Sequence, residues 1–278
     1  MKQIILPDEL KLENKQAVQV YNYQSSQAIT KQQITLNQHT FSFLIEGTKE
    51  VFFDHSSLTL DSSKFIIMRS GNCLMTEKLS AHNQYQSILL FFTKEQLSKF
   101  IQKTEFNLVP KKTYKSIHSF GYDEFIQGFV KSLVNISTLP QKLQNQLLEV
   151  KLEEIILYLI AQYGDDFLHG LLQKGDNTTQ KFIHTIENNK FNKLSIKDLA
   201  FLCNMSTSTF KRHFEKHYTV SPMKWFQNER MEYAYYLLHQ EQKSSSEIYL
   251  ELGYQSLSSF IQAYKAKYGT TPKQHQKN

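Results

Sequence analysis

The stretch "SIKDLAFLCNMSTSTFKRHFEKHYTVSP" (residues 195–222) decides the fold of the C-terminal part of this chain. Ser195 suits the start of a short helix, because its hydroxyl can accept a backbone N–H there. Asn204 suits the left-handed backbone that ends such a helix. Ser206 or Thr207 can then cap a second helix. The local pattern therefore predicts a helix, a tight turn and another helix.

The second of these helices has two different sides. Its predicted buried side has the spacing i, i+3, i+4, i+7 and consists of Phe210, His213, Phe214 and His217. The opposite side has the same spacing and carries Ser208, Lys211, Arg212 and Glu215. Small hydroxyl residues at the start let the helix approach a phosphate closely, and Lys211 and Arg212 offer donors that guanine edges accept. The pattern predicts a recognition helix in a major groove, and the alternative is a solvated face on an ordinary helix pair.

The unit is repeated further along the chain. Asp198-Leu199 recurs 49 residues later as Glu247-Ile248, and after one inserted residue the offset becomes 50. At this offset the aromatic and proline positions match: Phe210 with Phe260, Phe214 with Tyr264, Tyr218 with Tyr268, and Pro222 with Pro272. Two tandem helix-turn-helix units joined by a helix over 222–240 favour the recognition-helix interpretation.

The positive charge of the chain is concentrated in the same region. The net charge is +6, and residues 178–278 hold 14 Lys and Arg against 8 Asp and Glu, whereas residues 1–177 hold 18 of each kind. A basic module on a neutral body indicates a polyanionic partner such as double-stranded DNA.

The N-terminal part has the pattern of a β-structure followed by helices. Residues 18–92 alternate between apolar and polar with turn residues between short runs, which is typical of a small barrel or sandwich. Helical spacing then covers 93–106, 122–137 and 141–164. We predict an α+β fold with a cupin-like β-barrel and flanking helices in a regulatory and dimerisation domain (1–172), and an all-α DNA-binding domain (178–278).

The predicted long helix at 141–164 carries a near-heptad apolar seam. Two interpretations remain open for it, a homodimer interface or packing against the chain's own barrel. The residues assigned to dimerisation are Leu148, Leu152, Ile155, Ile156 and Leu159.

Other classes of protein are disfavoured by what the sequence contains. No apolar run is long enough for a membrane span, and the first residues do not form a secretory signal. Cys73 and Cys203 are too far apart in sequence to indicate a disulfide framework. We therefore expect a cytoplasmic protein. His39, His55 and His82 are widely separated, without a His-x-His ligand pair. We therefore expect no enzyme activity, catalytic residue, metal or cofactor. The alternative is a cupin-type metal enzyme or ligand-binding protein with an accessory DNA-binding domain.

The two repeats resemble the paired helix-turn-helix signature of the arabinose-regulator-type (AraC/XylS) transcription factors. "LSIKDLAFLCNMSTSTFKRHFEKHYTVSP" and "SSSEIYLELGYQSLSSFIQAYKAKYGTTP" are both similar to it, and the resemblance covers about residues 180–275. It implies a DNA-binding transcription activator that acts with RNA polymerase, forms a homodimer, and is controlled by a small effector or partner protein through the N-terminal domain.

The resemblance also implies which residues face DNA. The base-reading positions are Ser208, Lys211 and Arg212 in the first unit, and Leu257, Ser258, Ile261 and Gln262 in the second. The phosphate-contacting candidates are Ser206, Thr207, Lys224, Arg230, Lys265 and Lys267. Because the second set lacks Lys and Arg, we expect it to read A·T-rich sequence or mainly grip the backbone. Thr219 stands where the family usually has glycine, and a positive φ there would cost on the order of 1 kcal/mol.

A small effector in the barrel would need a pocket lined by apolar side chains, although aromatic stripes of this kind more often form a solid core. The candidate lining residues are Phe41, Phe43, Phe52, Phe65, Met68 and Met75.

Overall fold

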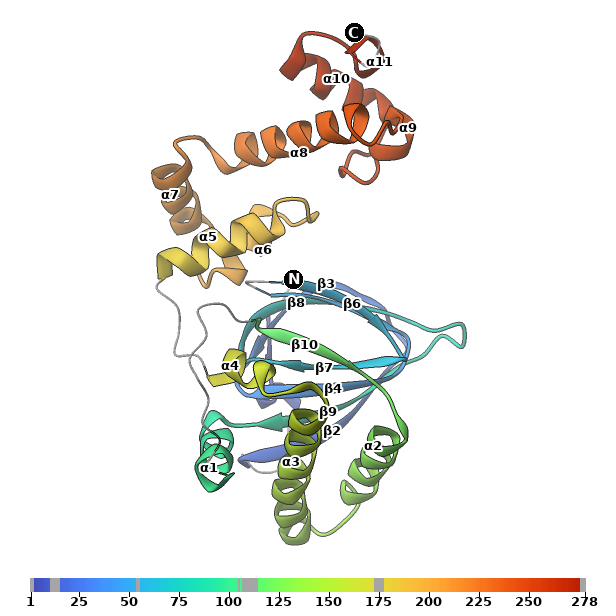
Figure 1. The fold of residues 1–278 in the computed structure, drawn as a ribbon, viewed down its shortest axis with the longest axis vertical. Helices are drawn as coiled ribbons and strands as arrows, with labels where there is room; N and C mark the ends of the chain where they lie inside the picture. Colours follow the sequence, from blue (N-terminus) through green and yellow to red (C-terminus); the bar gives the residue numbers. More distant parts are fainter. Residues whose placement is uncertain are drawn as a thin grey trace. The chain divides into compact units, whose positions relative to one another are not determined.

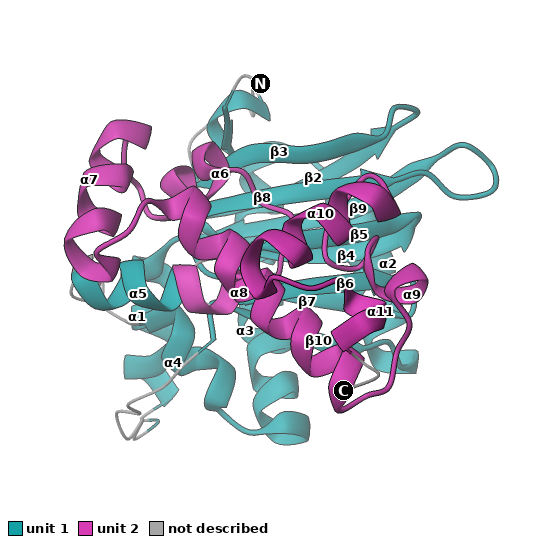
Figure 2. Cartoon of the chain, turned by 90° about the horizontal axis from the view of Figure 1, so that it is seen from above, with its two compact units in different colours: residues 1–185 teal, residues 186–278 magenta. Residues whose placement is uncertain are grey.

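A computed structural model describes residues 3–10, 16–53, 56–104, 106, 115–172 and 178–275. Contacts divide the chain into two compact units, residues 1–185 and residues 186–278 (Figure 2). The division falls within helix α5 (Thr178–Asn189), eight residues after the predicted start of the DNA-binding domain at residue 178. Residues 173–177, between the two predicted domains, lie outside the described residues. Within the described part of the chain, no helix combines the length and apolarity needed to cross a membrane.

The first unit is built on two five-stranded sheets (Figure 1). The first sheet has the order β1-β3-β8-β5-β6: Ile4–Leu6, Ile29–Leu36, Gly71–Lys78, Thr48–Phe52 and Ser57–Asp61. The second has the order β10-β7-β4-β9-β2: Ile117–Gly121, Lys64–Met68, His39–Glu46, Tyr85–Phe92 and Val18–Ser25. The predicted β-region at 18–92 corresponds to β2–β9, whereas β1, β10 and the short 3-10 helix η1 (Asp8–Leu10) were not predicted.

The second sheet is buried on both faces. One face packs with the helices α1 (Lys94–Thr104), α2 (Glu124–Ile136), α3 (Gln141–Tyr163) and α4 (Asp166–Leu172). Its aromatic side chains Phe41, Phe43 and Phe65 join this helical layer. The other face, with Leu44, Ile66 and Met68, packs in a second core with residues of the first sheet. Side chains alternate along a strand, so covering both faces explains why β4 is buried at every position from 39 to 44.

Helix α3 is apolar on two sides, and this corrects the predicted dimer interface. The five side chains assigned to dimerisation are at most 1% exposed and lie in the core formed with the second sheet: Leu148, Leu152, Ile155, Ile156 and Leu159. Burial of this seam against the unit's own sheet leaves it no surface for a second copy. Three other apolar residues spaced by seven, Leu143, Val150 and Leu157, are 44%, 63% and 45% exposed.

The described part of the second unit is entirely helical outside its turns. It continues from α5 with α6 (Ile196–Leu202), α7 (Thr207–Tyr218), α8 (Pro222–His239), α9 (Ser245–Ile248), α10 (Leu257–Tyr268) and α11 (Pro272–His275). The pairs α6–α7 and α9–α10 are the two predicted helix-turn-helix units, and α8 joins them. The predicted class, an α+β unit followed by an all-α unit, is confirmed.

Local sequence explains where these helices begin and end. Ser195 accepts a hydrogen bond from the backbone N–H of Asp198, whose carboxylate accepts one from the backbone N–H of Ser195. Asn204 ends the first helix of the pair with a φ of 58°. Both are the roles that the sequence predicted.

Candidate nucleic-acid interface

The predicted recognition helix of the first unit, α7, presents a small and basic exposed side; we call it the first reader helix and its counterpart α10 the second. Ser206 caps it, accepting a hydrogen bond of 3.1 Å from the backbone N–H of Thr209. Phe210 and Phe214 are fully buried, so the opposite side must face outward. The predicted base-reading residues of this helix are all exposed: Ser208, Lys211 and Arg212. The hydroxyl-rich start and the two cations thus lie on one accessible surface.

One part of the predicted buried side of α7 is wrong. His217 is exposed and His213 is half-buried, although both share the spacing of the buried phenylalanines. Phe214 and Tyr218 complete the packing instead by contacting Trp225 of α8, with ring centroids 5.6 and 4.8 Å away. The helix therefore docks through its aromatic residues and leaves the last histidine in solvent.

The second reader helix, α10, is less basic and partly occupied by packing. Ser256 caps it through a hydrogen bond of 3.2 Å from the backbone N–H of Ser259. Ser258 and Gln262 are exposed, whereas Leu257 and Ile261 are half-buried against the core of the second helix-turn-helix unit. Two of the four positions assigned to this reader therefore also contribute to packing.

The two reader helices end in matching left-handed turns. Thr219 follows α7 with a φ of 57°, and Gly269 follows α10 with a φ of 75°. Thr219 therefore does adopt the positive φ that was considered for this position.

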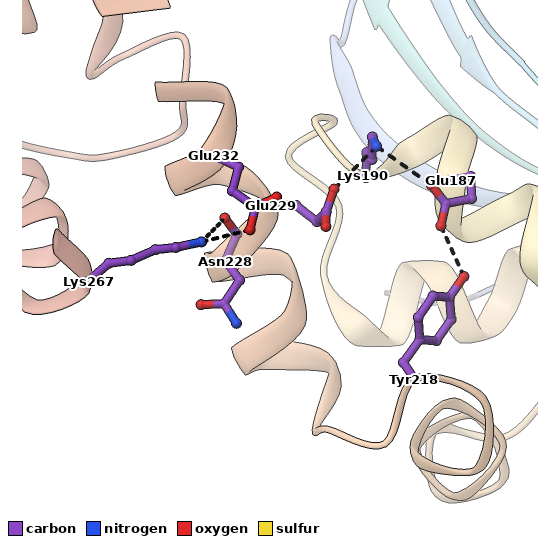
Figure 3. A network of polar contacts seen from close by, with 7 residues as sticks. All are labelled: Glu187, Lys190, Tyr218, Asn228, Glu229, Glu232 and Lys267. Atoms are coloured by element: carbon purple, nitrogen blue, oxygen red, sulfur yellow. Dashed lines mark hydrogen bonds and ion pairs between the residues drawn. The ribbon is translucent and has the colours of Figure 1, made fainter. Parts of the chain in front are cut away.

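The cations assigned to phosphate contacts have different environments. Lys224 and Lys265 are exposed, as is Thr207, and Arg230 is half-exposed. Lys267 is already engaged, because its Nζ donates to the Asn228 carbonyl and the Glu232 carboxylate, both at 3.0 Å (Figure 3). Lys267 therefore ties the end of α10 to α8, and we leave it out of the phosphate-binding set.

The first unit contains an apolar cavity of about 150 Å³ between its two sheets. Met68 and Met75 line it as expected, but Phe41, Phe43 and Phe65 do not, because they point to the helical layer. The remaining aliphatic lining comes from β1, η1, β3 and β9: Ile4, Leu6, Leu10, Ile29, Ile34, Leu36 and Leu89.

A buried ion pair that the sequence patterns do not indicate lies at the wall of this cavity. Lys49 Nζ is 3.3 Å from a Glu77 oxygen and donates to Ser42 Oγ at 3.1 Å, and both charged side chains are at most 5% exposed. Lys49 and Glu77 are cross-strand partners on β5 and β8. Their sequence positions look like ordinary polar strand positions, so only the pairing of the two strands reveals them. The pair adds polarity to the cavity wall without net charge.

Several histidine and carboxylate side chains of the first unit are potential metal ligands. His39 is buried and its Nδ1 accepts a hydrogen bond from the Ser70 backbone N–H at 3.0 Å. Burial, reinforced by the charges of Lys94 and Arg69, lowers the pKa of His39 to about 4. His55 lies outside the described residues. Asp165, Asp166 and His169, around the start of α4, form a group of three potential metal ligands among the described residues.

Individual proteins of known function are similar to this chain. The thermoregulatory protein LcrF of Yersinia pestis is 31% identical over 129 residues, 46% of this chain and 48% of LcrF, so the matched segment spans about half of that relative. The transcriptional regulator ExsA of Pseudomonas aeruginosa is 25% identical over 236 residues, 82% of each chain. Apo ToxT of Vibrio cholerae matches with a TM-score of 0.45 and 12% identity over 95% of this chain and 98% of ToxT.

Two family models match the chain, one in each unit. The ExsA N-terminal regulatory domain matches residues 39–171, which hold most of the sheets and helices of the first unit. A helix-turn-helix domain matches residues 199–278, which include both reader helices. The chain therefore combines an ExsA-type N-terminal regulatory domain with a C-terminal helix-turn-helix domain of the type found in the AraC-family transcription regulators that it resembles.

Proposed function

We propose that this chain is a sequence-specific DNA-binding transcription activator. The observation that carries the proposal is the exposed side of α7, where a capped, hydroxyl-rich helix start leads into Lys211 and Arg212. An activator rather than a repressor is supported by relatives such as the virulence regulon transcriptional activator VirF of Yersinia enterocolitica. Activation requires productive contact with RNA polymerase, which we include as a partner.

The two readers act on one face of the duplex. Helix α8 has 18 residues and is therefore about 27 Å long, which suits two helices that enter successive major grooves about 34 Å apart. Arg212 and Lys211 read guanine in one groove. The second reader, with Ser258 and Gln262 as its exposed positions, reads adenine or holds the backbone. Thr207, Lys224, Arg230 and Lys265 supply phosphate contacts.

Residues 1–172 form the regulatory domain in this proposal. The cavity between its sheets is large enough for a molecule of about benzene size, and its lining is mostly apolar. A small effector would be held there, close to the Lys49–Glu77 pair. Titration of the purified protein with small apolar molecules, followed by thermal unfolding, tests this site against control by a partner protein.

The protein forms a homodimer through the outer side of α3. Leu143, Val150 and Leu157 are exposed and repeat every seven residues, the spacing at which one helix meets another along a seam. A second copy presents the same stripe, so a symmetric pair buries both.

Selection from a random duplex pool by the full-length protein tests the DNA-reading proposal. Two enriched blocks about one helical turn apart are expected if both units read bases. One enriched block with A·T-rich flanks would indicate that α10 mainly holds the DNA backbone. Lack of enrichment both with the full chain and with residues 178–278 contradicts the proposal.

A further inference from the structure

The segment 190–193, between α5 and α6, connects parts of the second unit that are far apart in sequence. Lys190 Nζ lies 3.2 Å from Glu229 Oε2 on α8. The ring of Phe191 lies 4.5 Å from the ring of Tyr233, one turn further along α8. Lys193 Nζ donates to the carbonyl of Leu250, just after α9, at 2.6 Å. We call this segment, with its side chains Lys190, Phe191 and Lys193, the clamp.

The clamp matters because the two reader helices are connected mainly through α8, on which they pack at different positions. The first reader packs on the start of α8, where Trp225 and Phe226 contact Phe214. The second reader packs on the later turns of α8, where Ala234 and Leu238 belong to the same core as Phe260. A single connecting helix can bend or twist between such contacts. The clamp directly precedes the first helix-turn-helix unit in sequence, yet it contacts Glu229 near the middle of α8, Tyr233 on the later half of α8 and Leu250 just after α9.

A polar path links the end of each reader to α8 (Figure 3). At the end of α7, the Tyr218 hydroxyl donates to Glu187 at 3.2 Å, and Glu187 pairs with Lys190 at 3.6 Å. Lys190 then reaches Glu229. The other path runs from Lys267, at the end of α10, to Glu232 on the next turn of α8.

The charge of Lys190 is retained in this position. Burial opposes ionisation, but the hydrogen bond to Glu229 and the charges of Glu229 and Glu187 raise the pKa of Lys190 overall. The Lys190 ammonium is therefore protonated throughout the physiological pH range.

We propose that the clamp is a positioning element that sets the distance and rotation between α7 and α10, and thereby the number of base pairs between the two half-sites. This rests on the proposed DNA-reading function, because spacing matters only if both units engage DNA. Because the groups involved are partly exposed, each contact stabilises the fold only modestly. Removal of the clamp is therefore expected to loosen the relation between the readers while each unit remains folded.

The distance between the readers can be measured without DNA. The two buried native cysteines are first replaced by alanine in the full-length protein. Spin labels attached at Ser208→Cys and Ser258→Cys then report the distribution of α7–α10 distances by pulsed electron paramagnetic resonance. The triple variant Lys190→Ala, Phe191→Ala, Lys193→Ala is expected to broaden or shift the distribution. Lys243→Ala, which removes the exposed pair with Glu251 within the second helix-turn-helix unit, is the matched control and leaves it unchanged. An unchanged distribution in the triple variant overturns the proposal.

A charge swap separates positioning from loss of folding. Lys190→Glu is expected to broaden the distribution of α7–α10 distances, and adding Glu229→Lys is expected to narrow it again. Failure of the second change to restore the wild-type distribution, with both variants folded by circular dichroism, contradicts the role of this pair.

Selection of DNA then connects geometry with specificity. The triple variant should enrich the same sequence blocks as wild type but accept spacers one base pair longer or shorter between them. Its preference for the optimal spacer over these two should be at least tenfold smaller than that of wild type. A spacing preference equal to that of wild type overturns the proposal. Absence of any blocks for the wild type would refute the DNA-reading function instead, and the distance measurement would still decide whether the clamp positions the readers.

Discussion

Arg212 is the exposed residue on the first reader helix whose guanidinium can form two parallel hydrogen bonds with one guanine. Arg212→Ala is expected to relax base preference at one position of the site and to weaken binding to the preferred sequence by about 1–3 kcal/mol. Competition binding with single-base variants of the selected site measures both effects. Lys216→Ala, an exposed cation near the end of the same helix, is the control and keeps the base preference. A uniform loss of affinity for all sequences in Arg212→Ala would make Arg212 a phosphate contact.

His39 predicts a specific pH dependence of stability. Its pKa is about 4 in the folded protein, well below the ordinary value of 6.5, mainly because of burial. Above pH 6.5 the ring is neutral in both folded and unfolded states, whereas between 6.5 and 4 the unfolded chain binds the proton first. Acidification through this window should therefore lower the free energy of unfolding by up to about 3 kcal/mol from this group.

Urea unfolding at pH 7 and pH 4.5 measures the effect of His39. The variant His39→Asn keeps an acceptor for the Ser70 N–H but cannot titrate, so its loss of stability over the same interval should be smaller. Equal pH dependence in the two proteins would show that His39 is not responsible.

The ends of α7 and α10 allow the two repeats to be compared directly. Thr219 adopts a left-handed backbone that disfavours a branched side chain, while Gly269 occupies the equivalent turn without that restriction. Thr219→Gly is expected to stabilise the protein by up to about 1 kcal/mol, and Gly269→Thr to destabilise it by a similar amount. Thermal and urea unfolding check both changes. A destabilising Thr219→Gly would mean that the Thr219 hydroxyl, which donates to the Tyr218 carbonyl, outweighs the backbone strain.

Helix α3 predicts how the protein associates. If the proposed dimer forms through its exposed stripe, a charge in the middle of that stripe, in Val150→Asp, should raise the dissociation constant of the dimer at least tenfold, because the carboxylate would be buried in the seam. Sedimentation velocity over a concentration series provides the measurement. Gln162→Asp places the same charge on an exposed position outside the stripe and should leave association intact. If Val150→Asp dimerises like wild type, the stripe is not the interface.

The charge distribution of the whole chain predicts a strong salt dependence of DNA binding. All excess positive charge lies in residues 178–278, so phosphate contacts made there release counterions. Each neutralised phosphate contributes about −0.9 to the slope of log affinity against log salt concentration. Lys224→Ala and Lys265→Ala should each make the slope less negative by about 1, without changing the base preference. Fluorescence anisotropy between 50 and 300 mM salt checks this, and an unaltered slope removes the residue from the set of phosphate contacts.

Much of the second unit follows from local sequence, because helix caps, left-handed ends and helical periodicity are properties of a few consecutive residues. Ser195, Asn204 and Ser206 have the roles predicted for them. The internal repeat, with its constant offset between matching aromatic residues, is enough to predict that the two readers form a pair. For the same reason the β-region at 18–92 and the long helices were predicted to within a few residues.

Contacts between distant segments settled the remaining features. Periodicity showed that α3 has an apolar seam, but only its packing on the second sheet showed that this seam is internal and that another stripe is exposed. The Lys49–Glu77 pair depends on the register of β5 with β8, and Lys267 depends on the approach of α10 to α8. Local sequence encodes backbone preferences and amphipathicity, whereas burial and partner choice depend on which surfaces meet when the chain packs.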